Sequence, residues 1–233
     1  ALPIPLPPLE EQQRIVAVLD DAFEGLARAR ENAKVNLQNA RELFENSRAD
    51  VFSRLLTTER IKSLGEISSR VSVGHVGETS SHYVEDGGVP FVRSQNVRAG
   101  GIDLDGVKYI TENFHKALKK SQLQGGELLF VRVGANRADC CSMPMELGET
   151  NCANIVFARP TEGNLRYLEH YCQSAVGRSK LLNMSTGSAQ GVINTKSVAT
   201  LPIPLPSEAE QDRIAGELDG LREAAATLGD SYN

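Results

Sequence analysis

The sequence has few of the residues on which most catalytic sites and membrane proteins depend. Tryptophan is absent, aromatic residues make up 5% of the chain, and four cysteines and four histidines occur among 233 residues. No apolar run approaches the roughly 20 residues that a membrane-spanning helix needs, and no secretory signal opens the chain. We therefore expect that the protein does not associate with a membrane.

The cysteines and histidines do not form a recognisable metal site. No C-x-x-C pair is present, and no H-E-x-x-H or H-x-H spacing occurs. Cys140 and Cys141 are adjacent, so on a strand they would point to opposite faces and could not ligate one metal together. We predict that all the cysteines are reduced, buried thiols and that the histidines have ordinary structural roles.

Common catalytic signatures are also missing. The chain has no G-x-x-x-x-G-K-[ST] phosphate loop, no G-x-G-x-x-G dinucleotide loop and no G-x-S-x-G elbow. A metal-dependent nuclease typically has a carboxylate two residues before a lysine, and no lysine of this chain has one. The Asn- or Asp-Pro-Pro-aromatic segment that is typical of adenine methyltransferases is also absent. These absences favour a recognition module over an enzyme.

The charge is distributed unevenly. The formal net charge is −5, but residues 61–200 carry 15 basic and 13 acidic side chains, whereas residues 201–233 carry 2 and 7. The acidic excess therefore lies near the ends of the chain. A mildly basic central block binds DNA only if its arginines and lysines gather on one face, which a count of charges does not show.

The most informative feature is an internal repeat. The segment L-P-I-P-L-P is followed by E-Q-x-R-I and then L-D at residues 2–20, and the same pattern recurs at residues 201–219 with 12 of 19 positions identical. A repeat fixes architecture before any single residue does. We infer two equivalent strand-to-helix junctions on either side of one central block.

A long helix is predicted after the first junction. Proline suits the first helical turn, and no proline follows Pro8 until Pro90. Small or apolar residues first recur with the alternating spacing of a coiled-coil seam, at Ile15, Leu19, Ala22, Leu26, Ala29 and Ala33. About 48 residues would form a rod of ~70 Å. Its apolar stripe needs a helical partner.

A shorter helix follows the second junction, over about Glu208–Leu228. Its apolar stripe consists of Ile214, Leu218, Leu221, Ala225 and Leu228. This helix could pack against the first rod of the same chain or of a second copy.

The central block is predicted to mix strands and helix. Short β-rich runs lie at Val89–Arg93, Val107–Ile110, Leu128–Val133 and Ile155–Ala158, and Asn164–Asn183 is predicted to be a helix. The predicted fold class is α+β, with one mixed α/β globular domain between a long N-terminal coiled-coil helix and a shorter C-terminal helix. The boundaries are residues 1–8 for the first junction, 9–58 for the long helix, 59–206 for the domain ending in the second junction, and 207–233 for the second helix.

Three groups of polar residues in this block are candidates for DNA contact, because Arg pairs with guanine and Asn or Gln with adenine. The first follows a predicted strand and contains Arg93, Ser94, Gln95, Asn96 and Arg98. The second contains Arg132, Asn136 and Arg137, and the third Ser188, Gln190, Asn194 and Lys196. Lysines suit phosphate better than bases, which makes candidates of Lys116, Lys119 and Lys120. Simple solvation of polar loops is the competing interpretation.

The doubled junction, with V-P-F-V-R at Val89–Arg93, G-x-L-L-F-V-R at Gly126–Arg132 and a Gly187-Ser188 loop before Ile193-Asn194, resembles the specificity subunit of Type I restriction-modification systems. The resemblance covers the whole chain. It implies a target-recognition domain that reads one half of a split DNA site, carried on helices that act as a spacer.

The resemblance also implies the partners. They are double-stranded DNA, methyltransferase subunits that modify adenine, and restriction subunits that join the complex. The specificity subunit itself has no enzymatic activity and no cofactor, and S-adenosylmethionine, Mg and ATP are expected on the partner subunits. The implied location is the cytoplasm of a prokaryote.

The chain departs from the usual plan of this family because it has one recognition domain where two are typical. It therefore resembles half of a specificity subunit. A homodimer with antiparallel helices would restore two recognition domains, and its site would be an inverted repeat. Two other hypotheses stay open at this point: a coiled-coil scaffold whose globular head binds protein and not DNA, and a solitary DNA enzyme with an unfamiliar motif.

Overall fold

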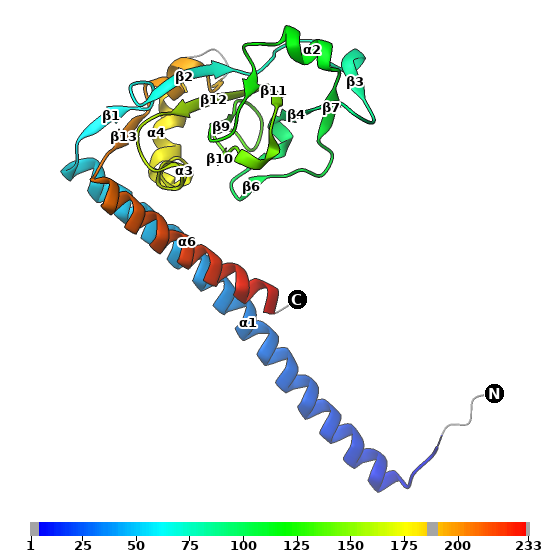
Figure 1. Ribbon diagram of the computed structural model, residues 1–233. Helices are drawn as coiled ribbons and strands as arrows, with labels where there is room; N and C mark the ends of the chain where they lie inside the picture. Colours follow the sequence, from blue (N-terminus) through cyan, green and yellow to red (C-terminus); the bar gives the residue numbers. More distant parts are fainter. Residues whose placement is uncertain (1–4, 186–190, 232–233) are drawn as a thin grey trace. The chain divides into compact units, whose positions relative to one another are not determined.

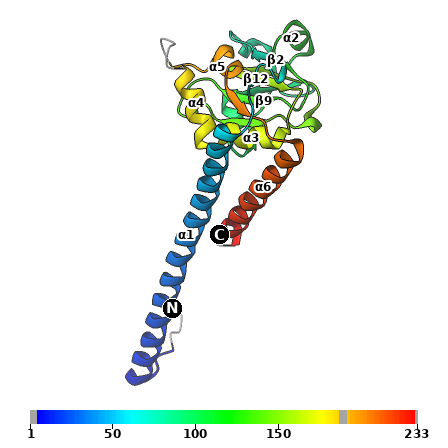
Figure 2. The same ribbon diagram turned by 90° about the vertical axis from the view of Figure 1, so that its left-hand side faces the viewer.

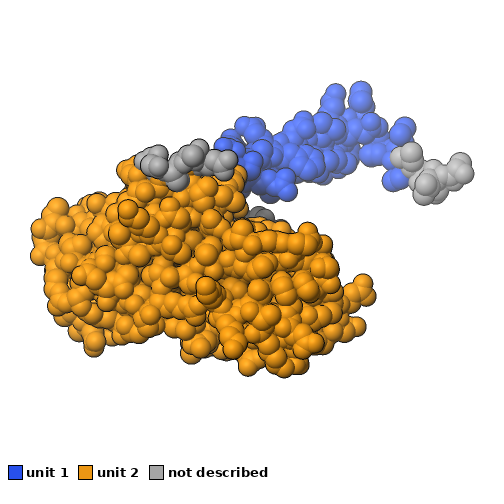
Figure 3. Space-filling model, turned by 90° about the horizontal axis from the view of Figure 1, so that it is seen from above, with its two compact units in different colours: residues 1–44, 220–233 blue, residues 45–219 orange. Residues whose placement is uncertain are grey.

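The computed structural model describes residues 5–185 and 191–231 and contains two compact units (Figure 3). One unit is formed by the chain up to residue 44 together with residues from 220 onward, and the other by residues 45–219. The second unit is wider than the predicted domain at 59–206, because it includes the last turns of one helix and the first turns of another.

The long helix α1, Leu9–Thr58, is a single element of 50 residues (Figure 1). It begins where the prolines end: the backbone N–H groups of Glu11 and Gln12 donate to the carbonyl of Pro8 at 3.0 and 3.1 Å. Glu10 and Glu11 occupy its first turn, where the helix dipole favours negative charge. The predicted continuous helix, and with it the predicted fold class, is confirmed.

The second helix, α6, Glu208–Ser231, begins with the same local contacts as α1. The Gln12 side-chain amide donates to the carbonyl of Pro7 at 2.7 Å, and that of Gln211 to the carbonyl of Pro206 at 2.9 Å. Arginine three residues after glutamate forms an ion pair in each, in the pairs Glu11–Arg14 and Glu210–Arg213. The sequence repeat is therefore a repeat of local structure.

The helical unit contains the N-terminal part of α1 and the end of α6. A β-carbon placed on Gly229 would lie 3.7 Å from a Leu37 methyl group, so the two helices touch there. Between them is a groove of about 890 Å³, lined by Leu26, Ala29, Arg30, Ala33, Lys34, Leu37, Arg41, Ala226, Gly229 and Asp230. The small residues of the predicted seam, Ala29 and Ala33, lie in this groove.

The globular unit contains two main sheets. The first is antiparallel throughout, in the order β10-β9-β12-β2, with bounds Cys140–Ser142, Leu128–Val131, Ile155–Pro160 and Ser68–Val73. The second has the order β3-β7-β4-β11-β8, with bounds Tyr83–Val84, Lys108–Ile110, Val89–Arg93, Thr150–Ala153 and Gln122–Leu123. Within the second sheet β4 and β11 are parallel, and the other pairs are antiparallel.

Two small strand pairs complete the sheets. β1, Ile61–Ser63, pairs with β13, Pro202–Pro204, and so joins the start of the globular chain to the second junction. β5, Val97–Arg98, pairs with β6, Gly101–Ile102. Short helical segments lie between the strands: 3-10 turns at Ser80–His82, Ser94–Asn96 and Met145–Leu147, and the helices α2, Glu112–Ala117, and α5, Thr195–Ala199.

The core lies between the sheets and their covering helices. Every residue of β9 is buried, and the side chains of Leu129 and Phe157 are fully buried in one cluster with Val92, Val97, Leu123, Val131, Cys141, Met143, Cys152 and Ile155. Burial raises the pKa of the Cys141 thiol to about 12, and it raises the pKa of Cys152 further. The cysteines are all buried and free of disulfides, as predicted.

The predicted helix at Asn164–Asn183 is broken into α3, Leu165–Gln173, and α4, Ala175–Ser185 (Figure 2). Ser174 between them has an extended backbone, and its hydroxyl accepts a hydrogen bond from the Gly177 N–H at 3.0 Å. The prediction of one helix was wrong because the apolar periodicity runs through the break, whereas serine capping ends one helix and starts the next.

Helix α3 is where both long helices attach to the globular unit. The Phe52 ring, near the end of α1, meets Tyr167 and Tyr171 of α3 edge-on at centroid distances of 5.4 and 5.3 Å. Arg48 donates to the backbone carbonyl of Gln173 at 3.1 Å.

The first turns of α6 are held by the same helix. The Gln211 side-chain oxygen accepts from the backbone N–H of Asn164 at 2.8 Å, and Asp219 binds His170 and Arg166 at 2.9 and 2.8 Å.

Among the described residues, no helix combines the length and apolar character that a bilayer span requires.

We predict that Gly177→Ala destabilises the protein, whereas Gly216→Ala does not. A β-carbon on Gly177 would lie 2.2 Å from the carbonyl oxygen of Tyr171, and relieving that clash should cost about 1–3 kcal/mol. Gly216 is also helical but has nothing within 4 Å of the added carbon, so alanine should raise stability there by roughly 0.5–1 kcal/mol. Urea unfolding followed by circular dichroism measures both, and equal effects would contradict the packing described at Ser174.

Candidate nucleic-acid interface

The first polar group lies where strand β4 ends. β4 and β11 are parallel and pair Phe91 with Asn151 and Arg93 with Ala153, so their carboxyl ends meet at one edge of the sheet. The next residue, Ser94, donates its hydroxyl to the carbonyl of Asn154 at 2.6 Å. This contact ties the loop after β4 to the loop after β11.

Arg93 and Arg98 are partly buried and engaged with the backbone. The Arg93 guanidinium donates to the carbonyl of Gly106 at 2.9 Å and lies over the Tyr83 ring at 5.9 Å. Arg98 donates to the carbonyl of Val97 at 3.1 Å. Arg93 is therefore held against β3 and the turn before β7 and is not extended into solvent.

Asn96 has a structural role that the sequence did not reveal. Its side chain is 1% exposed; the amide oxygen accepts from the Arg93 N–H, and the amide nitrogen donates to the carbonyl of Asp103, both at 3.0 Å. A buried amide that closes its own loop cannot reach a base edge. We therefore withdraw Asn96 as a base-reading residue, whereas the neighbouring Gln95 is exposed and has no side-chain partner among the described residues.

The arginines of the second polar group bind the chain just before Asn194, a member of the third group. The Ile193 N–H donates to the carbonyl of Arg132 at 3.1 Å, Arg132 donates back to the Ile193 carbonyl at 3.3 Å, and Arg137 donates to the carbonyl of Gly191. Asn136 is exposed on the intervening turn. The fold therefore brings Arg132 and Arg137 next to residues 191–193, which lie more than 50 positions later in the sequence.

Asn194 also has a structural role. It is the N-cap of α5, where its side-chain oxygen accepts from the Ser197 N–H at 2.9 Å. Capping engages the side-chain oxygen, so the structure gives Asn194 a helix-capping role that the sequence did not indicate. Lys196 on the same helix is exposed, and Ser188 and Gln190 lie outside the described residues.

The lysines differ in how free their charges are. Lys116 forms an ion pair with Glu112 at 2.9 Å, which raises the pKa of Lys116 and lowers that of Glu112 through their hydrogen bond. Lys119 and Lys120 are exposed, and neither has an ion-pair partner among the described residues. They line a hollow of about 430 Å³ together with Val73, Gly74, His75, Val76, Ala117, Leu118 and Ser121.

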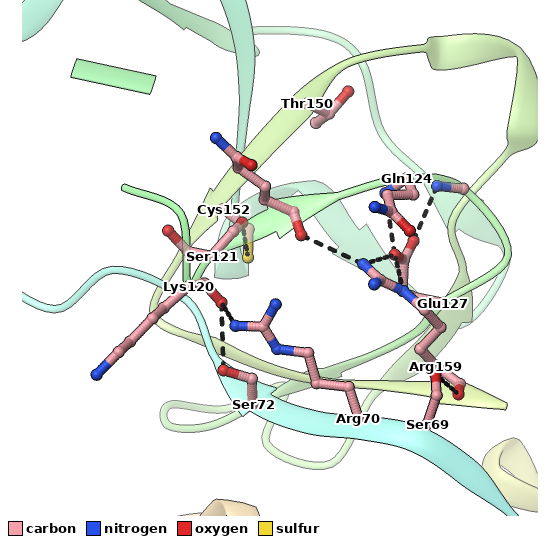
Figure 4. Close-up of polar contacts among 12 residues, drawn as sticks. Ser69, Arg70, Ser72, Lys120, Ser121, Gln124, Glu127, Thr150, Cys152 and Arg159 are labelled. Carbon is pink, nitrogen blue, oxygen red and sulfur yellow. Dashed lines mark hydrogen bonds and ion pairs between the residues drawn. The ribbon is translucent and has the colours of Figure 1, made fainter. Parts of the chain in front are cut away.

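The loop that carries these lysines is held by two residues that the sequence did not single out. Arg70 and Ser72, both on β2, donate to the backbone carbonyl of Lys120 at 2.8 and 3.2 Å (Figure 4). The Lys120 side chain points away from this group. A fixed backbone with a free ammonium group suits contact with a phosphate.

A second missed feature is the ion pair between Glu127 and Arg159, at 2.7 Å (Figure 4). Glu127 is fully buried, and its carboxylate also accepts from the backbone N–H groups of Gln124 and Gly125, at 2.9 Å each. It therefore fixes the turn before β9. Within the described ranges, no three His, Cys, Asp or Glu side chains are grouped so that they could hold a metal ion.

Two curated proteins match the chain in sequence. It is 26% identical over 154 residues to the type I restriction enzyme StySPI specificity subunit of Salmonella potsdam, and 23% identical over 156 residues to the EcoKI specificity subunit of Escherichia coli (strain K12). Each match spans 62% of this chain and 32% of the relative, so the chain matches about a third of the length of these proteins. No protein-family model matches the chain.

Solved structures share the fold. One from a study of complex assembly and conformational transition of the type I R-M system has a TM-score of 0.74 at 23% identity. The crystal structure of the HsdS subunit from Thermoanaerobacter tengcongensis has a TM-score of 0.71 at 24% identity. Both cover 98% of this chain but only 56% and 55% of the solved chains. The resemblance to Type I specificity subunits is confirmed.

We predict that Asn96→Ala lowers the stability of the protein, whereas Gln95→Ala does not. The first substitution leaves the Arg93 N–H and the Asp103 carbonyl without their partner, at a cost of about 1–3 kcal/mol. The second removes an exposed side chain and should stay within roughly 0.5 kcal/mol. Urea titration measures the free energy of unfolding of both variants. If Asn96→Ala is as stable as the unsubstituted protein, Asn96 becomes a candidate for base contact again.

Proposed function

We propose that this chain is a non-catalytic, sequence-specific DNA recognition subunit of a Type I restriction-modification system, or half of one. The globular unit reads one half of a bipartite site. The sequence match to two specificity subunits carries the proposal, and the doubled junction with its repeated glutamine contact supports it.

Recognition divides between two kinds of residue. Lys119, Lys120 and Lys196 contact phosphates, because they are exposed cations without ion-pair partners among the described residues. Gln95 and Asn136 read base edges from exposed loops. Arg132 and Arg137 flank the turn between β9 and β10 and bind the carbonyls of Ile193 and Gly191, and each retains guanidinium donors beyond those used there.

The helices provide the partner surfaces. Ile15 and Leu19 of the first junction are 42% and 47% exposed, whereas their counterparts Ile214 and Leu218 are 3% and 2% exposed against the globular unit. The N-terminal part of the apolar stripe of α1 is thus uncovered in the single chain, which supports association with a second copy through antiparallel helices.

Catalysis belongs to the partners. Adenine methyltransferase subunits, which bind S-adenosylmethionine, and restriction subunits, which use Mg and ATP, assemble on this subunit in the cytoplasm of a prokaryote. The chain itself needs no cofactor. A coiled-coil scaffold that binds protein and not DNA is the competing function, and DNA binding separates the two.

We predict that the full chain, alone or with type I methyltransferase subunits, shifts duplex DNA with an affinity that falls steeply as salt rises. Lys119→Gln should weaken binding to all sequences alike and reduce the slope of log K against log salt by about 1. Lys116→Gln is the matched control, with a smaller effect because Glu112 already pairs with that charge. Absence of binding under both conditions would favour the scaffold.

We also predict that α1 sets the spacing between half-sites. A four-residue insertion after Ala33 lengthens the helix by ~6 Å, which is about two base pairs of DNA. Mapping methylated adenines in cells that carry the variant should show a longer gap between unchanged half-sites. Altered half-site sequences would contradict a spacer role for the helix.

A further inference from the structure

Three chain segments end side by side in the globular unit. β4 and β11 run parallel, with Arg93 opposite Ala153. His75, just after β2, forms a parallel bridge with the same Ala153. The residues that follow these positions therefore emerge at one edge of the sheet, as binding residues do at the carboxyl ends of parallel strands in other folds.

Asn154 occupies this edge in an unusual backbone conformation. Its φ is 56°, and only Ala138 shares a positive φ among the non-glycine residues that the structure describes. Such a conformation costs free energy and persists only where the surroundings enforce it. Here they do: the Asn154 N–H donates to the His75 carbonyl at 3.1 Å, and its own carbonyl accepts from Ser94 at 2.6 Å.

The backbone of Asn154 is thus fixed on both sides while its side chain stays available. The residue is exposed, and its amide has no partner among the described residues. This is the reverse of Asn96 and Asn194, whose amides are used within the fold. A rigid backbone that presents a free amide loses little entropy when the amide binds.

The surroundings suit DNA. Gln95, another exposed amide, follows directly after Ser94, which contacts Asn154. On the other side, His75 lines the hollow of about 430 Å³ that Lys119 and Lys120 also line. Asn154 is thus bonded to His75, which lines a hollow with two cations that can hold a phosphate, and to Ser94, which precedes the second amide, Gln95.

We propose that Asn154 is a base-contacting residue of the DNA interface and that its amide reads an adenine in the major groove. The amide presents one donor and one acceptor, which match N7 and the N6 amino group of adenine. Gln95 contacts a neighbouring position. This assignment rests on the proposed function, since it names a specificity-determining residue of the same site.

The test is selection of binding sites from randomised duplex DNA by the full chain together with type I methyltransferase subunits. Asn154→Gly removes the amide and keeps the backbone, because glycine adopts a positive φ without strain. Asn154→Asp keeps the size and removes the donor. The matched control is Gln124→Ala. Gln124 also has an exposed amide, but it follows β8, which pairs with the start of β11, whereas Asn154 follows the end of β11. Thermal unfolding establishes that each variant is folded.

The expected result is loss of the preference for adenine at one position, about ten-fold or more, while the rest of the selected sequence is kept. The control variant should select the wild-type sequence. If Asn154→Gly and Asn154→Asp both select the wild-type sequence, or lose all binding uniformly, the proposal is wrong although DNA recognition stands. If the wild-type protein selects no sequence, the proposed function and this assignment fail together.

Discussion

The attachment of both long helices to α3 is the constraint on which the rest of the structure depends. Phe52 inserts its ring against Tyr167 and Tyr171, and removal of such a buried ring typically costs about 3–5 kcal/mol. Tyr167 and Tyr171 also donate their hydroxyls to carbonyls of the second junction, at Pro204 and Pro202. One short helix thus joins the end of α1, the strand β13 and the start of α6.

The repeated junction has a physical explanation in its glutamine. Gln211 uses its amide nitrogen on the carbonyl of Pro206 and its oxygen on the N–H of Asn164, so it fixes the turn and the globular unit at once. Gln12 makes the first of these contacts. The repeated sequence therefore encodes the same turn twice. In the second copy the glutamine also binds Asn164 of the globular unit, whereas in the first copy, among the described residues, it makes only the contact within the turn.

Polar residues in the globular unit divide into those that build loops and those that the loops present. Asn96 and Asn194 close turns and cap helices, and Glu127 fixes a turn from a fully buried position. These internal contacts hold the backbone still. Lys120 is of the second kind: its carbonyl is bound by Arg70 and Ser72, and its exposed side chain is presented from that fixed backbone.

The long helix, the doubled junction, the strands β4, β7, β9 and β12 and the family resemblance could all be predicted from the sequence, whereas β2, β3, β8, β10 and β11 could not. The predicted features depend on periodicity, proline placement and local repeats, which are properties of neighbouring residues. The sequence did not separate Asn96 from Gln95, did not reveal the break at Ser174, and did not single out Asn154. These features follow from the folded chain, because burial, capping partners and a positive φ depend on contacts such as Asn96 with Asp103 and Asn154 with His75, which residue type alone does not specify.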